Sequence, residues 1–379
     1  MRVLHVIPSI APRYGGPSSA VVGMCTSLQN RGVAVQIATT DADGPARLPV
    51  PHGRRMEWSG VPTVFFPRQL SEAYKYSRPL ASWLAENVAE FDVVHVHAVF
   101  SHACLAASSA CRRRGVPYVV RPLGTLDPWS LRQKPLRKRL LWHLGVQRML
   151  RGAAAMHYTT ASEKRLAETA LDLQRGVVIP LGVDETLFRT TRSRGEPPYV
   201  LVLGRLHPKK GIESLVDVFL EVSERLPEWN LVVAGDGEPE YVASLRAHVA
   251  RLDAHHRVVF RGWVQGQAKA AALAGAAVLA LPSHQENFGL VVAEALACGT
   301  PVLVSTHVNL ADEIAAANAG WVVPLDRAIL RDRLTCILRN RCERERRGQA
   351  GRSLAMQAFR WSSVAGEVQR LYQSLLEAA

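Results

Sequence analysis

Short runs of apolar and β-branched residues alternate with longer segments of helical periodicity along almost the whole chain. The first run, Met1 to Pro8, is followed by a helical pattern at Ser18–Arg31 and a second run at Val33–Thr39. The same rhythm predicts further strands at Phe91–His97, Val116–Arg121, Met156–Thr159, Tyr199–Leu203, Asn230–Ala234, Arg257–Phe260, Ala277–Leu281 and Pro301–Ser305. Strands that alternate with helices indicate parallel sheets covered by helices, and therefore an α/β fold.

The length of 379 residues favours two domains over one. A polar stretch from Thr190 to Pro198, rich in glycine and proline, separates two sets of predicted strands and indicates an interdomain linker. We therefore expect an N-terminal domain at residues 1–190 and a C-terminal domain at 196–358. Apolar residues on one face of about 362–379 predict a terminal helix.

The composition indicates a globular protein with anionic partners. Lysine and arginine total 46 against 33 acidic residues, a net charge of +13. The longest mostly apolar run, Ala270 to Pro282, is too short to cross a bilayer, and the first run is shorter than a secretory signal, so we expect a cytoplasmic protein. The sequence contains no GxGxxG, P-loop, GxSxG or HExxH pattern, which leaves dinucleotide binding and zinc hydrolysis without support.

The most informative pattern runs from Ser283 to Pro301. A polar loop containing Glu286 follows a strand, and an Ala/Leu-rich helix carries Glu294 two turns inside. Backbone amides at a helix start can hold phosphate, and carboxylates accept the paired O–H groups of a ribose or sugar. The alternative is a solvated helix with two surface glutamates, against which the apolar setting of Glu294 argues.

This segment resembles the E-x7-E signature of the retaining glycosyltransferases of family 4, which have the GT-B fold, and the resemblance extends over nearly the whole chain. It implies two Rossmann-like domains facing across a cleft, with the C-terminal helix returning to the N-terminal domain. It also implies that Glu286 lies near the donor sugar as a catalytic residue and that Glu294 binds the donor ribose. Backbone groups for the sugar and diphosphate would come from Asn287, Phe288, Gly289 and Leu290.

Two further loops of the C-terminal half fit this resemblance. Gly204 to Gly211 looks like the family's GRLxxxKG loop, in which Arg205 and Lys210 would hold the donor diphosphate; alone, it could be a basic surface turn. Two cations beside a helix start neutralise a pyrophosphate, so we expect neither a metal nor a cofactor. Gly235 would lie at the nucleotide edge and Val264 near the base, although a plain glycine turn explains Gly235 equally well.

In the N-terminal half, Gly15 and Gly16 follow the first strand, where glycines let a backbone approach a ligand. The family places this loop near the donor phosphates and acceptor, and carries a histidine at a strand end close to the donor sugar. His95 and His97 both fit that histidine; we favour His97, because it is nearer the strand's carboxyl end. A structural histidine is the alternative.

The next loop departs from the family pattern. Leu123 stands before the glycine where many relatives have a histidine or similar polar residue. A subgroup associated with bacterial surface polysaccharide assembly looks similar at this point. In that subgroup's pattern, Arg121 or Asp127 would contact the acceptor.

The basic stretch of residues 132–151 interleaves leucines with seven lysines and arginines and includes a tryptophan. Such a basic amphipathic helix suits an anionic membrane surface, such as the inner face of the plasma membrane, although a solvated helix face is the plain alternative. We expect no nucleic-acid partner, because no RNA- or DNA-binding motif accompanies the charge.

These patterns predict a retaining glycosyltransferase. It would move a hexose from a nucleotide-diphosphate sugar to a hydroxyl of a saccharide or polyprenyl-linked acceptor in exopolysaccharide or lipopolysaccharide assembly. The alternatives are a nucleotide-sugar-binding protein without transferase activity and a GT-B sugar-nucleotide epimerase. The sequence does not decide between a UDP and a GDP donor. The donor sugar, the acceptor, the linkage and the oligomeric state also stay open.

Overall fold

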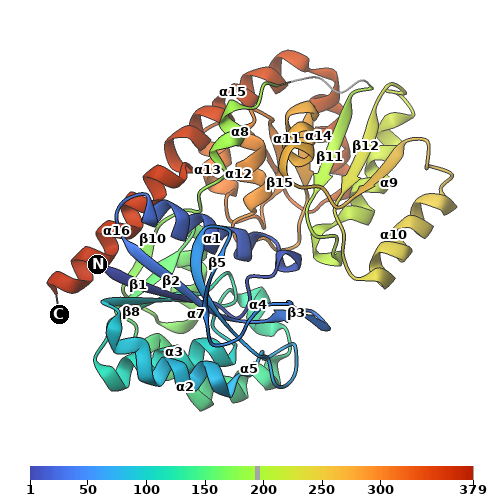
Figure 1. Cartoon of the computed structure of the whole chain (residues 1–379). Helices are drawn as coiled ribbons and strands as arrows, with labels where there is room; N and C mark the ends of the chain where they lie inside the picture. Colours follow the sequence, from blue (N-terminus) through green and yellow to red (C-terminus); the bar gives the residue numbers. More distant parts are fainter. Residues whose placement is uncertain (193–196, 379) are drawn as a thin grey trace. The chain divides into compact units, whose positions relative to one another are not determined.

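The computed structural model describes residues 1–192 and 197–378, and the chain divides into two compact units (Figure 1). Unit 1 comprises Met1–Gly182 and Trp361–Ala379, and unit 2 comprises Val183–Arg360. The sequence placed the end of the first domain at residue 190. The structure instead assigns residues from Val183 onward to unit 2, because helix α8 (Glu185–Arg189) packs on α12 (Leu290–Ala297). Of the predicted linker, residues 193–196 lie outside the described residues.

Unit 1 is built on an eight-stranded sheet in the order β10-β9-β8-β7-β1-β2-β6-β5, parallel except for the β5–β6 edge pair. A separate antiparallel hairpin pairs β3 (Ala42–Asp43) with β4 (Ala46–Arg47). The strands of the large sheet are β1 (Arg2–Val6), β2 (Ala34–Thr40), β5 (Arg55–Trp58), β6 (Val61–Phe66), β7 (Val93–His97), β8 (Tyr118–Arg121), β9 (Ala155–Tyr158) and β10 (Gly176–Val178).

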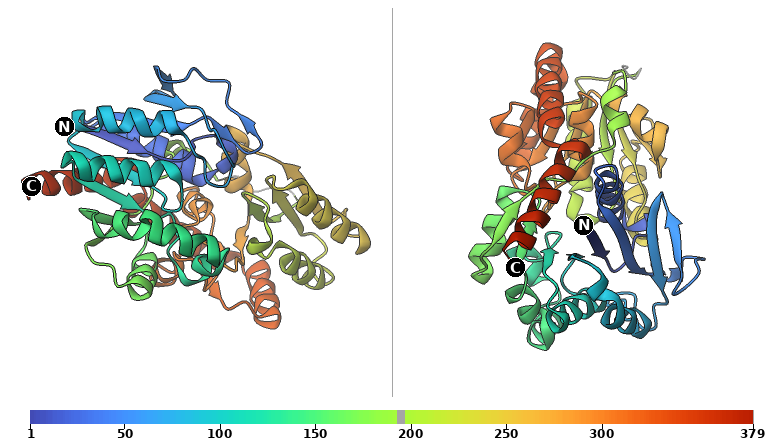
Figure 2. Two further views of the ribbon diagram at one scale, coloured as in Figure 1. Left: turned by 90° about the horizontal axis from the view of Figure 1, so that it is seen from below. Right: turned by 60° about the vertical axis from the view of Figure 1, so that its left-hand side comes forward.

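Helices cover both faces of this sheet, which is why the strands are nearly continuous apolar runs. One face, with Leu4, Val6 and Val94, packs on α2 and α3, and the opposite face carries His5 and His95 toward α16 (Figures 1 and 2). The helical segments are η1 (Pro12–Tyr14), α1 (Gly16–Gln29), α2 (Arg78–Asn87), η2 (Val88–Glu90), α3 (His102–Arg114), α4 (Pro128–Arg132), α5 (Pro135–Leu141), a π-helical turn η3 (Trp142–Val146), α6 (Gln147–Arg151), α7 (Ala161–Leu171) and α16 (Trp361–Glu377).

The last helix, α16, returns to unit 1 and packs along α1 (Figure 1), which confirms the expectation from the sequence. The Trp361 ring fills the space that a side chain at Gly23 or Gly182 would occupy. Farther along, Tyr372 is completely buried and bonds to His95, and the Arg31 Nε donates to Gln369 Oε1 at 2.8 Å. These contacts tie the end of the chain to its first strands.

Unit 2 contains a six-stranded parallel sheet in the order β13-β12-β11-β14-β15-β16. Numbered within the unit, this is the 3-2-1-4-5-6 order of a Rossmann fold. Its strands are β11 (Tyr199–Leu203), β12 (Asn230–Ala234), β13 (Val258–Gly262), β14 (Val278–Leu281), β15 (Val302–Ser305) and β16 (Gly320–Val323). Its remaining helices are η4 (Pro208–Lys210), α9 (Ile212–Ser223), α10 (Pro239–Arg251), α11 (Gly266–Gly275), α13 (Ala311–Ala316), α14 (Arg327–Arg339) and α15 (Arg341–Ala358).

The basic stretch 132–151 is not one helix, as the sequence suggested, but a series of short helical pieces. Pro135 starts α5 after an interruption at Gln133 and Lys134, and Gly145 has a non-helical backbone inside the π-helical turn. Among the described helices, none combines the length and apolarity needed to cross a lipid bilayer.

Replacing Gly23 tests how α16 is held. A Cβ at this position would lie 2.7 Å from Trp361 Cε2, so Gly23→Ala must push the indole away, although helix propensity alone favours alanine. We expect the free energy of unfolding in urea to fall by about 1–3 kcal/mol. Ser19→Ala, at an exposed position of the same helix, is the control and should be nearly neutral. A Gly23→Ala protein as stable as this control would contradict the packing described here.

Candidate functional site

The loops after β11 and β14 lie next to each other at the carboxyl edge of the unit 2 sheet, since these two strands are neighbours. The helix after β11 is α9, which packs in the core cluster with Val200 and Val202, whereas the helix after β14 is α12, which packs on α15. The chain therefore reverses its winding between these strands. In open α/β sheets, ligands bind at such a switch point.

The side chains of Lys210 and Glu286 form an ion pair at this point. Lys210 comes from the turn η4 after β11 and Glu286 from the loop after β14, and only 13% and 15% of their side chains are exposed. Lys209 joins the same loops, because its carbonyl accepts from the His284 amide at 2.7 Å and its Nζ donates to Gln285 Oε1 at 3.0 Å. The two predicted motifs, residues 204–211 and 283–301, thus contact each other at this edge of the sheet.

The charges around Glu286 keep it ionised. Burial raises the pKa of this carboxyl, but the positive charges of Lys210, Lys209 and Arg205 outweigh burial and hold it below the usual value. Arg205 itself is exposed. Three cations accompany one carboxylate, so the site has an excess of positive charge that a phosphorylated ligand can neutralise.

Glycines allow the loops at this edge to approach one another. Gly235, after β12, has φ +143°, its amide donates to the Gly262 carbonyl at 2.7 Å, and a Cβ on it would lie 1.8 Å from the Gly204 oxygen. A side chain is impossible there. Gly235 therefore holds the loops after β11, β12 and β13 together, and Val264 follows two residues after Gly262.

The loop before α12 is fixed from both sides. The Glu286 amide donates to the His307 carbonyl, and the Glu286 carbonyl accepts from Asn309. Phe288 is buried against Phe359, and Gly289, with φ +71°, is the N-cap residue of α12. The first amides of an α-helix have no intrahelical acceptor. Asn287 and Leu290 flank these residues, so the predicted donor segment Asn287–Leu290 lies beside the Lys210–Glu286 pair.

Glu294, inside α12, forms a second ion pair that the sequence analysis missed. Lys269 of α11 lies 2.6 Å from Glu294 Oε1, and Glu294 is 7% exposed. Burial raises the pKa of Glu294, and Lys269 opposes that effect. The available signal was Lys269 itself, the only charged residue in the alanine-rich segment between Trp263 and Leu281.

Unit 1 has its own switch point between β1 and β7. Gly15 and Gly16 lie in the segment that leads from β1 to α1; Gly15 has φ +67° and precedes the helix, and a Cβ there would meet open space. His97 is the last residue of the neighbouring β7. The structure therefore gathers the predicted N-terminal site residues Gly15, Gly16 and His97 at one switch point.

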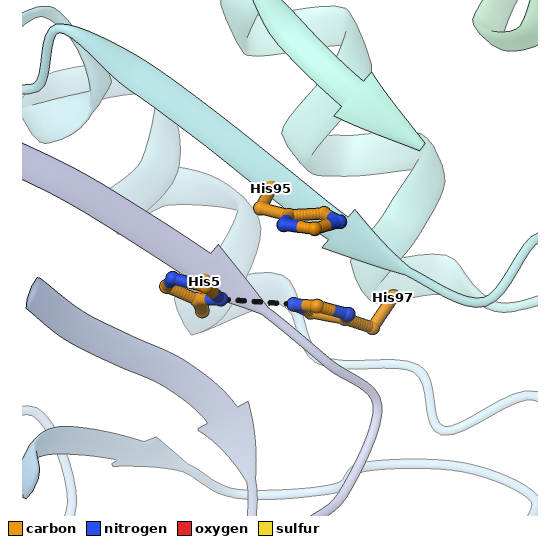
Figure 3. Close-up of side chains that lie close together, drawn as sticks. All are labelled: His5, His95 and His97. Carbon is orange, nitrogen blue, oxygen red and sulfur yellow. Dashed lines mark hydrogen bonds between the residues drawn. The ribbon is translucent and has the colours of Figure 1, made fainter. Parts of the chain in front are cut away.

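His97 belongs to a group of completely buried histidines (Figure 3). Its Nε2 lies 3.0 Å from His5 Nδ1, and its ring stacks on His95 at 4.2 Å between centroids. His95 is bonded on both sides, to the Tyr372 hydroxyl at 2.7 Å and to His157 at 3.3 Å. His97 Nδ1 has no partner in the described part of the chain. Of the two candidate histidines, His97 is therefore the one with a ring nitrogen that makes no hydrogen bond within the described residues, and that nitrogen is buried.

The hydrogen bonds determine the tautomers of two rings. His157 Nε2 must donate to the Ile179 carbonyl, at 2.8 Å, because a carbonyl only accepts. If His157 is neutral, its Nδ1 accepts from His95 Nε2, and His95 Nδ1 then accepts from the Tyr372 hydroxyl. A chain of hydrogen bonds thus runs from α16 to the end of β10.

Neutral rings are what this environment requires. Burial, and then the positive charge of Arg121, lowers the pKa of His5 and of His157 to about 3. Burial and neighbouring charges likewise hold the pKa of His95 and His97 well below the usual value.

One ring nitrogen from each of His5, His95 and His97 lies within 4.8 Å of the others, the arrangement that a metal ion could use. The chemistry of the group does not fit a cation. Both nitrogens of His95 already have protein partners, and Arg121 places a positive charge beside the rings. We therefore describe the group as a hydrogen-bonded core cluster.

The two predicted acceptor residues are both buried. Arg121 is as completely buried as His97, and in the described residues its guanidinium nitrogens make no hydrogen bond. Asp127 caps α4, accepting from the Ser130 amide at 2.7 Å and the Ser130 hydroxyl at 2.9 Å. Leu123 takes a left-handed backbone, φ +58°, ahead of Gly124.

Two Rossmann-like units, with cations and carboxylates gathered at the switch point of the second, define the class of GT-B glycosyltransferases. The family model "Glycosyl transferase 4-like domain" matches residues 15–182, and "Glycosyl transferases group 1" matches residues 183–354. The chain belongs to this glycosyltransferase family.

Similar proteins agree with this assignment. A phosphatidyl-myo-inositol mannosyltransferase of Mycobacterium tuberculosis is 29% identical, over 99% of this chain and 97% of the relative. A D-inositol 3-phosphate glycosyltransferase of Stackebrandtia nassauensis is also 29% identical, over 84% and 78%. The crystal structure of HepE from Anabaena with UDP and glucose has a TM-score of 0.78 at 19% identity, covering 99% and 100% of the two chains.

The buried histidines predict how stability depends on pH. Their pKa is lowered in the folded protein, so below about pH 6.5 the unfolded chain binds more protons, and the free energy of unfolding falls as the pH drops toward 3. Each such histidine contributes a slope of up to about 1.4 kcal/mol per pH unit. Urea unfolding between pH 7.5 and 5 measures this slope. His5→Gln should make it shallower, and an unchanged slope would contradict a buried neutral His5.

Proposed function

We propose that this protein is a retaining glycosyltransferase that moves a hexose from a nucleotide-diphosphate sugar to a hydroxyl of a saccharide or lipid-linked acceptor, in the assembly of a surface polysaccharide or glycolipid. The observation that carries the proposal is the Lys210–Glu286 ion pair, with Arg205 beside it, at the switch point of unit 2. This group combines excess positive charge for a diphosphate with an ionised carboxylate for a sugar.

The chemistry follows from these charges. When the bond between the sugar and the diphosphate breaks, negative charge grows on the diphosphate, and Arg205 and Lys210 stabilise it. Positive charge grows on the sugar ring. The carboxylate of Glu286 is ionised and lies beside Lys210, so in this proposal it stabilises the positive charge on the sugar. Two protein cations supply the charge that a metal supplies elsewhere, so we propose a reaction without a metal.

The remaining predicted residues complete the donor site in this proposal. Gly235, Val264 and Glu294 would contact the nucleoside, and the backbone of Asn287–Leu290 the sugar and diphosphate. Gly15, Gly16 and the uncommitted Nδ1 of His97 would act on the sugar from unit 1. The UDP and glucose bound to HepE, and the lipid named for the mycobacterial mannosyltransferase, support a nucleotide-sugar donor and a lipid-linked acceptor.

Donor binding is tested with UDP, GDP, ADP and their sugars in thermal-shift assays, with and without EDTA. We expect one nucleotide to raise the melting temperature by mass action, with no effect of EDTA. Lys210→Ala should weaken that nucleotide roughly 10- to 100-fold, because it removes a charge-assisted contact to the diphosphate. Lys164→Met, which removes a lysine of α7 in unit 1, is the control. If folded protein responds to no nucleotide, the proposal is wrong.

Transfer itself needs a separate measurement. Glu286→Gln should still bind the nucleotide but lose about 100-fold or more in turnover, since it removes charge that acts on the transition state. NMR of the product should show the anomeric configuration of the donor. Conversion of the donor without any acceptor would identify an epimerase instead, and binding without turnover over a panel of acceptors would favour a binding protein.

We also propose that unit 1 binds an anionic membrane surface, the inner face of the plasma membrane, through residues 132–151. Leu136, Leu140 and Leu144 are spaced four residues apart and are 84%, 59% and 66% exposed. Exposed basic residues surround them, and the segment contains no aspartate or glutamate. The exposed cations of the segment are Arg132, Lys134, Arg139, Arg148 and Arg151. Apolar side chains within a basic surface suit the interface of an anionic bilayer.

Cosedimentation with vesicles tests this surface. The protein should bind vesicles of phosphatidylglycerol and phosphatidylcholine but not phosphatidylcholine alone, and salt should weaken binding. Changing Leu136, Leu140 and Leu144 together to serine should reduce the bound fraction several-fold with little change in melting temperature. Leu252→Ser with Leu325→Ser, at exposed leucines of unit 2, is the matched control. Equal binding by both variants would rule this surface out.

A further inference from the structure

We propose that Lys269 is a positioning residue for the donor site, which fixes the carboxylate of Glu294 so that this carboxylate receives the two ribose hydroxyls of the nucleotide. This inference rests on the proposed function, because it assumes that a nucleotide binds at the switch point of unit 2. It adds a residue from α11, an element that contributes neither of the two motifs, and it assigns that residue a specificity for the ribose.

The geometry joins two helices that pack together although the strands before them are not neighbours in the sheet. Lys269 lies in α11, which follows β13, and Glu294 lies in α12, which follows β14, and the two helices pack together. Lys269 Nζ lies 2.6 Å from Oε1 of Glu294. In the described residues the Glu294 side chain has no second hydrogen bond, so Oε2 is left to bind a ligand.

The setting explains why Glu294 needs a fixed cation. Its side chain is 9% exposed within an apolar helix, so burial raises its pKa, and the charge of Asp184 at the start of α8 acts in the same direction. Cys298, the C-cap residue of α12, has a thiol whose pKa is raised to about 12, so this thiol stays neutral. Among these neighbours Lys269 alone favours the charged form of Glu294.

An ionised carboxylate held in one orientation can distinguish a ribose from a sugar that lacks the two adjacent hydroxyls. Two adjacent hydroxyls donate two hydrogen bonds, and a carboxylate can accept both, whereas a protonated carboxyl must use one oxygen as a donor. A mobile carboxylate would also lose side-chain freedom on binding. Lys269 removes both difficulties before the nucleotide binds. Its positive charge keeps the Glu294 carboxylate ionised, and its contact with one oxygen fixes the side chain.

The experiment compares UDP and GDP with their 2′,3′-dideoxy counterparts by isothermal titration calorimetry. Wild-type protein should bind its ribonucleotide about 10-fold or more tightly than the dideoxy form. Glu294→Gln and Lys269→Met should each bring this ratio close to 1, and Lys269→Arg should restore most of it. Lys164→Met is the charge-matched control and should keep the wild-type ratio.

The ratio of ribonucleotide to dideoxy affinity is also measured as a function of pH. A lysine with only a structural role would not change this pH dependence. In wild-type protein the ratio should stay constant between pH 6 and 8.5. In Lys269→Met it should rise with pH, because the unpaired Glu294 ionises only as the pH increases. Comparing ribo and dideoxy forms cancels the titration of the phosphates.

The outcomes separate this inference from the proposed function. If wild-type protein binds neither UDP nor GDP, the proposed donor site fails. If Glu294→Gln loses the ratio but Lys269→Met keeps it, the donor site stands and the role of Lys269 is wrong. If Lys269→Met weakens ribo and dideoxy forms equally, Lys269 acts on another part of the ligand, and the inference is again overturned.

Discussion

Parallel sheets must be covered on both faces, and this constraint determines where the chemistry of this protein lies. In both units helices cover the sheets, so the strands are almost entirely apolar and polar groups collect at the strand ends. The histidine cluster of unit 1 is the exception. Its rings lie within a sheet face, and they are tolerated because each is neutral and because hydrogen bonds from Tyr372 to Ile179 satisfy most of their nitrogens. The same cluster fastens the last helix to the first strands.

The sequence predicted much of the fold because apolar periodicity is a local signal. The strand at Tyr199–Leu203 and the helix that ends near Gly299 were recognised within a few residues. The strands β6 and β16 were missed: β6 is joined to β5 by a tight turn, and only the short helix α13 separates β15 from β16. The basic stretch was read as one helix because leucine spacing dominated, whereas Pro135 and Gly145 break it. The unit boundary at Gly182 depends on packing by α8, which no local pattern records.

Some residues of the candidate site could likewise be predicted from the sequence, and others could not. Glu286 and Lys210 were found because each stands in a motif of its own, and the strand order then brings the two motifs together. Lys269 was missed because its importance comes from a partner 25 residues away on another helix. Arg121 was expected at an acceptor from the loop pattern of a family subgroup, and that pattern does not show that its strand pairs it with His97 inside the sheet. A residue's chemistry is readable from sequence, whereas the burial that decides its use depends on contacts between distant elements.

The two ion pairs of unit 2 differ in a way that matches the two halves of a nucleotide-diphosphate sugar. Around Glu286 the positive charges of Lys210, Lys209 and Arg205 together lower the pKa of that carboxyl. Around Glu294 one lysine faces one carboxylate in an apolar setting, and the pKa remains raised. The first arrangement gains most by accepting a dianion, while the second gains nothing from added charge and offers only hydrogen bonds. A ligand with an anionic centre and a neutral diol beside it is therefore the one that satisfies both pairs at once, and a simple phosphate or a free sugar would satisfy only one of them.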